Sequence, residues 1–225
     1  MKYTTLYFDL DNTLLDFSAA EKNAINKLLS LYGIEPNHEY AEIYSKINQN
    51  VWERFERGEI EREEIFESRF VELMEKIGKK ADTKRMSQDY FSLIAEGHDV
   101  LPGARKVLKY VKEKGYTVCV TTNGVSRTQH KRIAESGLRE FFDYVFISEE
   151  IGHQKPEKEY FNFVILNTPE KDRKKILVIG DSQSSDILGG INAGIDTCWL
   201  NSKCVTARYK PTYEIGNISE LINIL

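Results

Sequence analysis

The distribution of apolar and polar residues divides the chain into a short first strand, a long helical segment and an alternating remainder. Residues Tyr3 to Asp9 are mostly apolar and rich in Thr, Tyr and Phe, and a polar turn follows them, which predicts a buried strand. From about Ser18 to Glu96 the chain is rich in Glu, Lys, Arg and Ile, with breaks near Gly33, Gly58 and Gly78. This segment predicts about four helices and no strand.

Beyond Pro102 and Gly103 the chain alternates between strand patterns and helix patterns. Strands that alternate with helices form parallel sheets covered on both faces. We therefore predict an α/β fold with a core of residues 1–16 and 99–225, into which residues 17–98 are inserted as an all-helical domain. A short edge strand near Tyr213 and a last helix from Ser219 complete the prediction. The other expected strands cover residues 116–121, 144–147, 176–179 and 197–200, and the expected helices cover residues 127–136, 157–167 and 185–193.

Composition and charge argue against several classes of protein. With 41% hydrophobic residues, 11% aromatic residues and a formal net charge of -4, the 225-residue chain has ample apolar surface to bury and no basic excess for nucleic acid or an anionic membrane. No apolar run approaches the roughly 20 residues needed to cross a bilayer. The three cysteines, Cys119, Cys198 and Cys204, form no C-x-x-C pair, which favours reduced thiols and a cytoplasmic location.

Polar segments follow the predicted strands at four places. In open parallel sheets, ligands bind beyond the carboxyl ends of the strands, at the point where the strand order reverses. We therefore expect these segments to converge on one cleft: Asp9 to Thr13, Thr121 to Gly124, Gly152 to Pro156, and Gly180 to Asp186.

Acidic residues characterise two of these segments. Asp9 and Asp11 are spaced two apart at a strand end, so both carboxylates can face one substrate, although a lone pair of this kind is more often a solvated turn. A second pair, Asp181 and Asp186, follows another apolar strand and favours the functional interpretation, because carboxylates that meet in one cleft repel each other unless a cation is bound. A hard cation with oxygen ligands indicates Mg²⁺.

The other two segments supply a positive charge and hydrogen-bonding groups. Lys155 precedes Pro156, which restricts the backbone where the side chain departs and favours a positioned charge over an ordinary surface lysine. Thr122, Asn123 and Gly124 supply a hydroxyl, an amide and a closely approachable backbone at a helix start, which suits phosphate oxygens. Without the other segments, these three residues would be no more than a helix cap.

The order of carboxylates, hydroxyl, lysine and second acidic pair resembles the haloacid dehalogenase superfamily, whose phosphotransferases use an aspartate nucleophile. The resemblance spans nearly the whole chain. It implies a Rossmannoid core and identifies residues 17–98 as a helical cap of the superfamily's first type. The positions that fill the family's motifs are Asp9, Asp11 and Thr13, then Thr122, then Lys155, then Asp181 and Asp186.

The resemblance also implies a role for each of these residues. The true dehalogenases of the superfamily lack the second aspartate, so Asp11 implies a phosphatase in which it protonates the leaving oxygen. Asp9 is implied as the nucleophile that forms an aspartyl-phosphate, which Asp11, now a base, opens with water. The implied Mg²⁺ ligands are Asp9, the Asp11 backbone carbonyl and Asp181, while Lys155 and Thr122 offset the phosphate charge. The supporting positions are Thr13, Asn123, Gly124 and Asp186.

A finer resemblance concerns the substrate. Segments within residues 47–60, 122–124, 148–152 and 186–201 are similar to the bacterial pyrimidine 5′-nucleotidases of the house-cleaning type, which implies a nucleoside 5′-monophosphate with a pyrimidine or deoxypyrimidine nucleoside. Asn48 and Trp52 lie one helical turn apart in the expected cap, where Trp52 could stack on a base while Asn48 forms a hydrogen bond. Packing inside the cap is the alternative for Trp52, and the same two interpretations apply to Phe17 at the hinge.

Three alternatives to a nucleotidase are open at this point. A phosphatase for another small organic phosphate, such as phosphoglycolate or a sugar phosphate, would carry identical catalytic residues, and a phosphomutase is a further possibility among enzymes. A non-catalytic binding protein on the same fold would lack Asp9 or Asp181, and both are present. If the protein is an enzyme, its expected partner is a small phosphorylated metabolite, and neither nucleic acid nor a membrane is expected to bind. The sequence leaves the oligomeric state open between a monomer and a weak homodimer.

Overall fold

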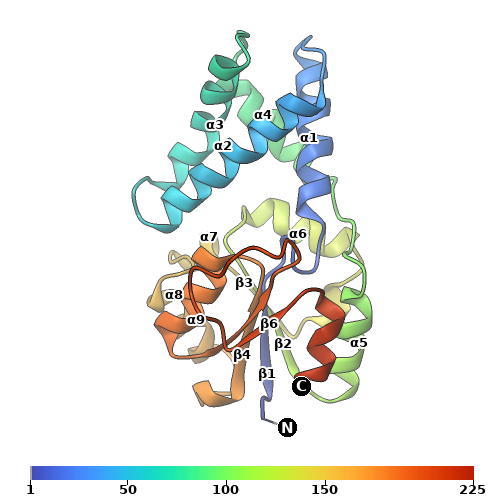
Figure 1. The fold of residues 1–225 in the computed structure, drawn as a ribbon, viewed down its shortest axis with the longest axis vertical. Coiled ribbons are helices and arrows are strands. Elements are labelled where there is room, and N and C mark those ends of the chain that lie inside the picture. Colours follow the sequence, from blue (N-terminus) through green and yellow to red (C-terminus); the bar gives the residue numbers. More distant parts are fainter. Residues whose placement is uncertain (1) are drawn as a thin grey trace. The chain divides into compact units, whose positions relative to one another are not determined.

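A computed structural model describes residues 2–225, which form two units. One unit comprises the chain up to Asp16 together with Asp99–Leu225, and the other comprises Phe17–His98. The first contains a sheet and is called the core unit here, whereas the second is entirely helical and is called the cap unit (Figure 1). Among the described residues, no helix is both long and apolar enough to span a membrane.

Parallel strands form a single sheet at the centre of the core unit. The strand order within the described residues is β3-β2-β1-β4-β5-β6, so the chain first adds strands on one side of β1 and then on the other. The order therefore reverses between β1 and β4, which is where ligands bind in sheets of this kind. The strands are β1 (Thr5–Phe8), β2 (Thr117–Thr122), β3 (Tyr144–Ile147), β4 (Ile176–Gly180), β5 (Asp196–Leu200) and β6 (Tyr213–Ile215).

The α-helices of the core unit lie between successive strands in the chain (Figure 1). The α-helices are α5 (Ala104–Glu113), α6 (Ser126–Glu135), α7 (Ser148–Ile151), α8 (Lys158–Leu166) and α9 (Leu188–Ala193). Short 3₁₀ segments occur at η1 (Arg139–Phe141), η2 (Arg173–Lys175) and η4 (Ile218–Asn223), and η3 (Gln183–Ile187) is a π-helix.

Side chains of the sheet alternate between two hydrophobic cores. Leu6 and Phe8 of β1 pack in one core with Val107 of α5, whereas Tyr7 packs in the other with Phe161 of α8. Because helices cover both faces, the strands are apolar at nearly every position. The structure thereby confirms the predicted α/β fold with a parallel sheet and a helical insertion.

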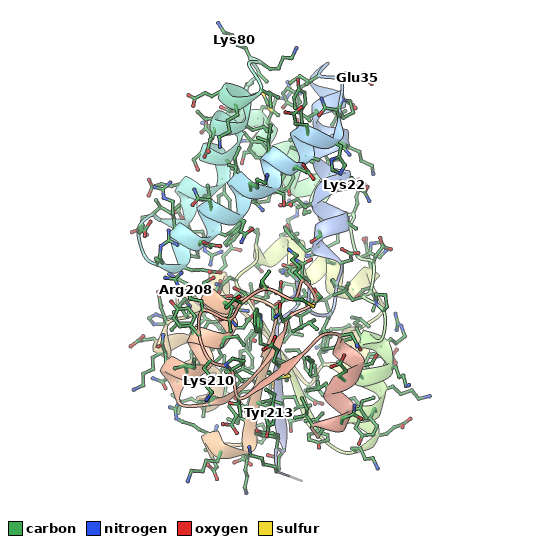
Figure 2. All side chains as sticks on the ribbon, in the orientation of Figure 1. Lys22, Glu35, Lys80, Arg208, Lys210 and Tyr213 are labelled. Atoms are coloured by element: carbon green, nitrogen blue, oxygen red, sulfur yellow. The ribbon has the colours of Figure 1, made fainter. Side chains whose placement is uncertain are left out.

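The cap unit consists of α1 (Phe17–Leu31), α2 (His38–Glu56), α3 (Arg62–Lys76) and α4 (Thr83–Ile94). Asn37 and Asp82 are the N-caps of α2 and α4, since the side chain of each accepts a hydrogen bond from a backbone N–H in the first turn. The charged surface of the cap unit includes Lys22, Glu35 and Lys80, which are exposed and project outward in Figure 2.

Several elements differ from the sequence prediction. Helix α5 was not among the expected helices, although its amphipathic pattern buries Ala104, Val107, Leu108 and Val111. The helix expected from residue 185 begins instead as the π-helix η3, and the last expected helix is the 3₁₀ segment η4. The edge strand expected near Tyr213 is β6.

Candidate active site

Asp9 lies directly after β1, where the strand order reverses. Its backbone N–H donates to the Ile179 carbonyl of β4 at 2.8 Å, which continues the strand pairing up to this residue. Asp11 follows in a tight turn, in which Asn12 adopts a left-handed φ of 56° and donates its N–H to Leu15 at 2.8 Å. The two carboxylates are thus placed by strand pairing and by a hydrogen-bonded turn.

Lys155 is almost completely buried and occupies the centre of the site. Its Nζ donates to Asp9 Oδ1 at 2.7 Å, to Asp186 Oδ1 at 2.6 Å and to the Thr121 carbonyl at 2.8 Å. An ammonium group has three N–H donors, so all of them are engaged. The Asn123 amide fixes the lysine backbone, because it donates to the Lys155 carbonyl at 2.8 Å and accepts from the Lys155 N–H at 2.9 Å.

Asp181 and Asp186 approach this lysine from the segment after β4. Asp186 is fully buried and accepts from the Ser182 N–H through Oδ2 at 3.1 Å, so both of its oxygens have partners. Gly180 makes room for it, because a Cβ at that position would lie 2.1 Å from Asp186 Oδ2. The Asp181 backbone carbonyl accepts from the Trp199 indole at 2.8 Å, whereas its carboxylate receives no hydrogen bond from residues 2–225.

Thr122 and Thr13 add two hydroxyl groups. The Thr122 Oγ1 atom accepts from the Gly124 N–H at 3.1 Å and from Gln129 Nε2 at 2.9 Å, which leaves its own O–H to donate to a ligand. Thr13 is fully buried, and its hydroxyl has no hydrogen-bond partner among the described residues. A buried hydroxyl without a partner is costly, so Thr13 offers a further polar contact at the site.

Two residues that were not expected at the site hold Asp11. Gln129 Nε2 donates to Asp11 Oδ2 at 2.8 Å, and Arg132 Nη1 donates to Asp11 Oδ1 and, at 3.0 Å, to Gln129 Oε1. Both side chains come from α6 and are buried. The i, i+3 spacing that places them on one helix face was visible in the sequence, but polar residues on a short helix are usually solvated.

Burial and neighbouring charges at the site shift three pKa values. Burial, reinforced by the charges of Asp186 and Asp11, raises the pKa of Asp9 to about 7 although Lys155 opposes the shift. Burial and the nearby Asp9 charge raise the pKa of Asp181 well above its ordinary value. Burial alone would lower the pKa of Lys155, but the charges of Asp186 and Asp9 outweigh it and raise that pKa.

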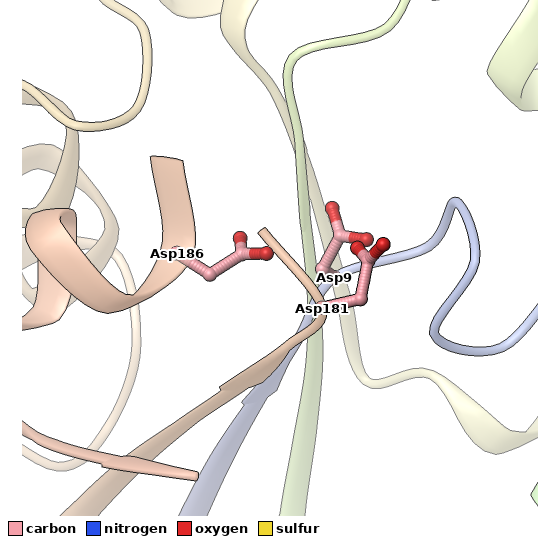
Figure 3. A group of neighbouring side chains, drawn as sticks. All are labelled: Asp9, Asp181 and Asp186. Atoms are coloured by element: carbon pink, nitrogen blue, oxygen red, sulfur yellow. The ribbon is translucent and has the colours of Figure 1, made fainter. Parts of the chain in front are cut away.

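These carboxylates suit a hard divalent cation. Oxygen atoms of Asp9, Asp181 and Asp186 all lie within 4.8 Å of one another, and Figure 3 shows the Asp9 and Asp181 carboxylates side by side, with Asp186 pointing toward them from a neighbouring helical segment. Since both oxygens of Asp186 already have partners, Asp9 and Asp181 are the side chains best placed to bind the cation. Burial and neighbouring negative charges raise the pKa values of these two residues, and a bound cation would oppose both effects by favouring the ionised carboxylates.

The three candidate substrate contacts of the cap unit differ in exposure. Asn48 is buried, donates to Glu21 Oε1 at 2.7 Å and accepts from Arg69 Nη1 at 2.8 Å, so its amide serves the interior of the cap. Trp52 is partly exposed, with its ring edge-on to Phe55 at 5.9 Å between centroids. Phe17 begins α1 and is also partly exposed against the cap core.

Comparison with known proteins gives one consistent result. A sequence model of the family described as haloacid dehalogenase-like hydrolase matches residues 6–200. The chain is 41% identical to the HAD-hydrolase YfnB of Bacillus subtilis over 226 residues, which cover 100% of this chain and 96% of that one. It is 36% identical to the pyrimidine 5′-nucleotidase PynA of Streptococcus pneumoniae, with 100% and 96% of the two chains covered, and 31% identical to the pyrimidine 5′-nucleotidase YjjG of Escherichia coli, with 100% and 99% covered.

The fold comparison agrees with the sequence comparison. The crystal structure of YfnB bound to magnesium superposes with a TM-score of 0.94, covering 100% of this chain and 99% of that one at 41% identity.

We predict that the protein loses stability in the absence of divalent cations as the pH rises from about 4 to about 7. Because the folded-state pKa of Asp9 lies near 7, above the ordinary 3.8, the folded state binds the Asp9 proton more tightly than the unfolded chain does. The stability gained in this way is complete below about pH 4 and is lost by the time the pH passes 7. Asp181→Asn removes one of the repelling carboxylates. Over the same pH interval, the free energy of unfolding of this variant should therefore fall by about 1 kcal/mol less than that of the wild-type protein. Urea unfolding with a chelator measures both slopes, and equal slopes would contradict the coupling.

We also predict that Asn48→Ala destabilises the protein by about 1–3 kcal/mol, because it removes a shared partner of buried Glu21 and Arg69. Gln49→Ala is the matched control, since Gln49 is exposed and its amide donates to Glu53 on the same helix at 2.9 Å. Its effect should stay within about 0.5 kcal/mol. Chemical unfolding separates the two variants. An Asn48→Ala protein as stable as the control would show that the amide is available for another role.

Proposed function

The chain belongs to the haloacid dehalogenase-like hydrolases, and we propose that it hydrolyses pyrimidine nucleoside 5′-monophosphates with Mg²⁺ through an aspartyl-phosphate. Its class is that of the phosphoric monoester hydrolases. The observation that carries the proposal is the buried constellation in which Lys155 contacts Asp9 and Asp186 beside Asp181, at the reversal point of the sheet.

The geometry supports Asp9 Oδ2 as the nucleophilic atom. Oδ1 accepts a hydrogen bond from Lys155, which orients the carboxylate and leaves Oδ2 to attack phosphorus. The attack forms an acyl-phosphate bond and breaks the bond between phosphorus and the leaving oxygen. Water then attacks the same phosphorus, releases inorganic phosphate and restores the Asp9 carboxylate.

Asp11 is proposed to move the protons in both steps. A nucleoside alkoxide is a poor leaving group, so protonation of its oxygen by the Asp11 carboxyl accelerates its departure. The resulting carboxylate then accepts a proton from the water that opens the acyl-phosphate. Its partly exposed position, with 26% of the side chain accessible, fits contact with both a substrate and water.

Lys155 and Thr122 are proposed to stabilise the phosphate by different means. All three N–H donors of Lys155 are engaged within the protein, so the lysine acts through its charge unless it gives up a partner. The Thr122 hydroxyl accepts two hydrogen bonds and keeps its hydrogen for a phosphate oxygen. Asn123 supports the lysine backbone and Asp186 its ammonium group.

The cation is proposed to bind to Asp9, Asp181 and the Asp11 backbone carbonyl. Bound there, Mg²⁺ would supply positive charge between nucleophile and phosphate and hold both in place. The donor set of carboxylates and the raised pKa of Asp9 support this assignment, as does the magnesium-bound structure of YfnB. Protonated Asp9 would be a poor nucleophile, so a cation that favours the carboxylate also favours the reaction.

The nucleotide preference rests on the similarity to PynA and YjjG over the whole chain. In the cap unit, Trp52 presents a partly exposed ring on which a base can stack, whereas the Asn48 amide is occupied by Glu21 and Arg69. We therefore retain Trp52 as the proposed base contact, with Phe17 as a second partly exposed aromatic residue. A cytoplasmic site of action fits the three free thiols.

We predict that hydrolysis requires Mg²⁺ and Asp9. Asp9→Asn should abolish turnover while the fold persists, because an amide cannot form the acyl-phosphate. Asp181→Asn should weaken Mg²⁺ binding by roughly tenfold or more and reduce the rise in melting temperature that Mg²⁺ produces. Asp196→Asn is the control and should keep full activity, because Asp196 lies at the amino end of β5, whereas the site lies at the carboxyl ends of the strands. Full activity after exhaustive chelation would remove the cation from the mechanism.

We further predict that Trp52→Ala raises KM for a deoxypyrimidine monophosphate by roughly tenfold, as expected from about 1–3 kcal/mol of lost stacking. Hydrolysis of p-nitrophenyl phosphate, which has no nucleoside, should change little. Phe66→Ala is the control, since Phe66 is another partly exposed aromatic residue of the cap and packs edge-on to Phe91 at 5.0 Å.

The comparison is made on kcat/KM for both substrates, with thermal unfolding of each variant. Equal losses on both substrates, together with a lower melting temperature, would assign Trp52 to cap packing. The substrate would then be sought among other small organic phosphates.

A further inference from the structure

The Asp11 carboxylate is held by two buried side chains that the proposed chemistry does not use. Gln129 Nε2 donates to Asp11 Oδ2 at 2.8 Å, and Arg132 Nη1 donates to Asp11 Oδ1. Arg132 Nη1 also donates to Gln129 Oε1 at 3.0 Å, which ties the two side chains together. We call this pair the α6 clamp, because both residues lie on one face of that helix.

Burial makes the clamp rigid. Gln129 and Arg132 are each 1% exposed, whereas 26% of the Asp11 side chain is accessible. A buried guanidinium is stable only with good partners, so Arg132 requires the Asp11 carboxylate as much as it orients it. Asp11 therefore takes its direction from the interior of the core unit, even though its carboxylate reaches the surface.

Gly124 provides the space that the clamp needs. A Cβ at this position would lie 2.4 Å from Gln129 Nε2, 2.6 Å from Cδ and 2.8 Å from Cγ. The backbone of Gly124 is not in the left-handed region, so lack of a side chain is the property that matters. The turn after β2 thus requires glycine because the Gln129 amide lies against it on the way to Asp11.

The clamp also joins Asp11 to the proposed phosphate contact. The same Gln129 Nε2 atom donates to Thr122 Oγ1 at 2.9 Å. One amide group therefore sets the positions of the hydroxyl assigned to the phosphate and of the carboxyl assigned to the leaving oxygen. A displacement of Gln129 would change both at once.

We propose that Gln129 and Arg132 are positioning residues that hold Asp11 in line with the leaving oxygen of the substrate. The proposal rests on the proposed role of Asp11 as the acid that protonates that oxygen. A clamp of this kind affects the rate most where protonation matters most, namely for esters of strongly basic alcohols and phenols. A residue that only supported the fold would lower the rate of all esters by the same factor.

The test uses phenyl phosphate and p-nitrophenyl phosphate, which are similar in size and differ in the basicity of the leaving oxygen. The variants are Arg132→Met, Gln129→Leu and Gly124→Ala, which reach the clamp from three positions, with Arg132→Lys as the conservative change. Arg105→Met is the matched control. That arginine also contacts the end of α6, through the Ser136 and Gly137 carbonyls at 2.7 and 3.1 Å, but it has no contact with Asp11.

We expect Arg132→Met to lose roughly tenfold or more in kcat on phenyl phosphate and less than about threefold on p-nitrophenyl phosphate, with little change in KM. Gln129→Leu and Gly124→Ala should show the same excess loss on phenyl phosphate, added to a loss common to both esters, because Gln129 also contacts Thr122. Arg132→Lys should recover part of the loss. Arg105→Met should lower the melting temperature, if it has any effect, and leave the ratio of the two rates unchanged.

A double-mutant cycle with Asp11→Asn supplies the second readout. Asp11→Asn alone should slow phenyl phosphate hydrolysis by roughly 10²- to 10⁴-fold. In that background Arg132→Met should cause almost no further loss, because the group that it positions is already gone. The double variant lacks both the Asp11 carboxylate and the Arg132 guanidinium, so it holds no buried unpaired charge and should fold.

The outcomes separate the clamp from the function on which it rests. Equal losses on both esters, or the same loss with and without Asp11, would overturn the positioning role and leave the acid role intact. If Asp11→Asn itself slowed both esters equally, the proposed acid role would fail first, and the clamp proposal would fall with it.

Discussion

The contact between the buried Lys155 ammonium and the carboxylates of Asp9 and Asp186 is the interaction on which the site depends. Carboxylates that lie together at the buried carboxyl ends of the strands repel one another, and Lys155 offsets part of that repulsion. Burial and the charges of Asp186 and Asp11 nevertheless keep the pKa of Asp9 raised, at about 7, so Lys155 alone does not restore an ordinary carboxylate. The missing positive charge explains why this arrangement suits a divalent cation and a reaction in which a phosphate dianion must be brought to a carboxylate.

The sheet topology brings these groups together although they are far apart in the chain. Because β1 pairs with β4 on one side and β2 on the other, Asp9, Asp181 and Thr122 all lie at neighbouring carboxyl ends. Two glycines then allow side chains to pack against these strand ends: Gly180 makes room for Asp186, and Gly124 makes room for Gln129. Each glycine is required by a particular side chain, so the motif and the packing around it are parts of one arrangement.

The strand-end residues can be predicted as one group from the sequence because their placement is local. A polar residue that follows a buried parallel strand lies at the carboxyl end of the sheet, independently of the structure of distant segments. Gln129 and Arg132 were missed because their burial depends on Asp11, more than a hundred residues away in the chain. Asn48 has the same difficulty in the cap unit, since its partners Glu21 and Arg69 lie on two other helices. Contacts of this kind arise from tertiary packing and leave no local pattern.

Acid quenching during turnover shows most directly whether Asp9 becomes covalently phosphorylated, as we propose. Wild-type protein is mixed with p-nitrophenyl phosphate and Mg²⁺, quenched within the first turnovers, digested and analysed by mass spectrometry. We expect one added phosphoryl group on the peptide that contains Asp9, removable by hydroxylamine and absent from Asp9→Asn. A phosphoryl group on another residue would contradict the role of Asp9 as nucleophile. A burst of p-nitrophenol with no labelled peptide would contradict it equally.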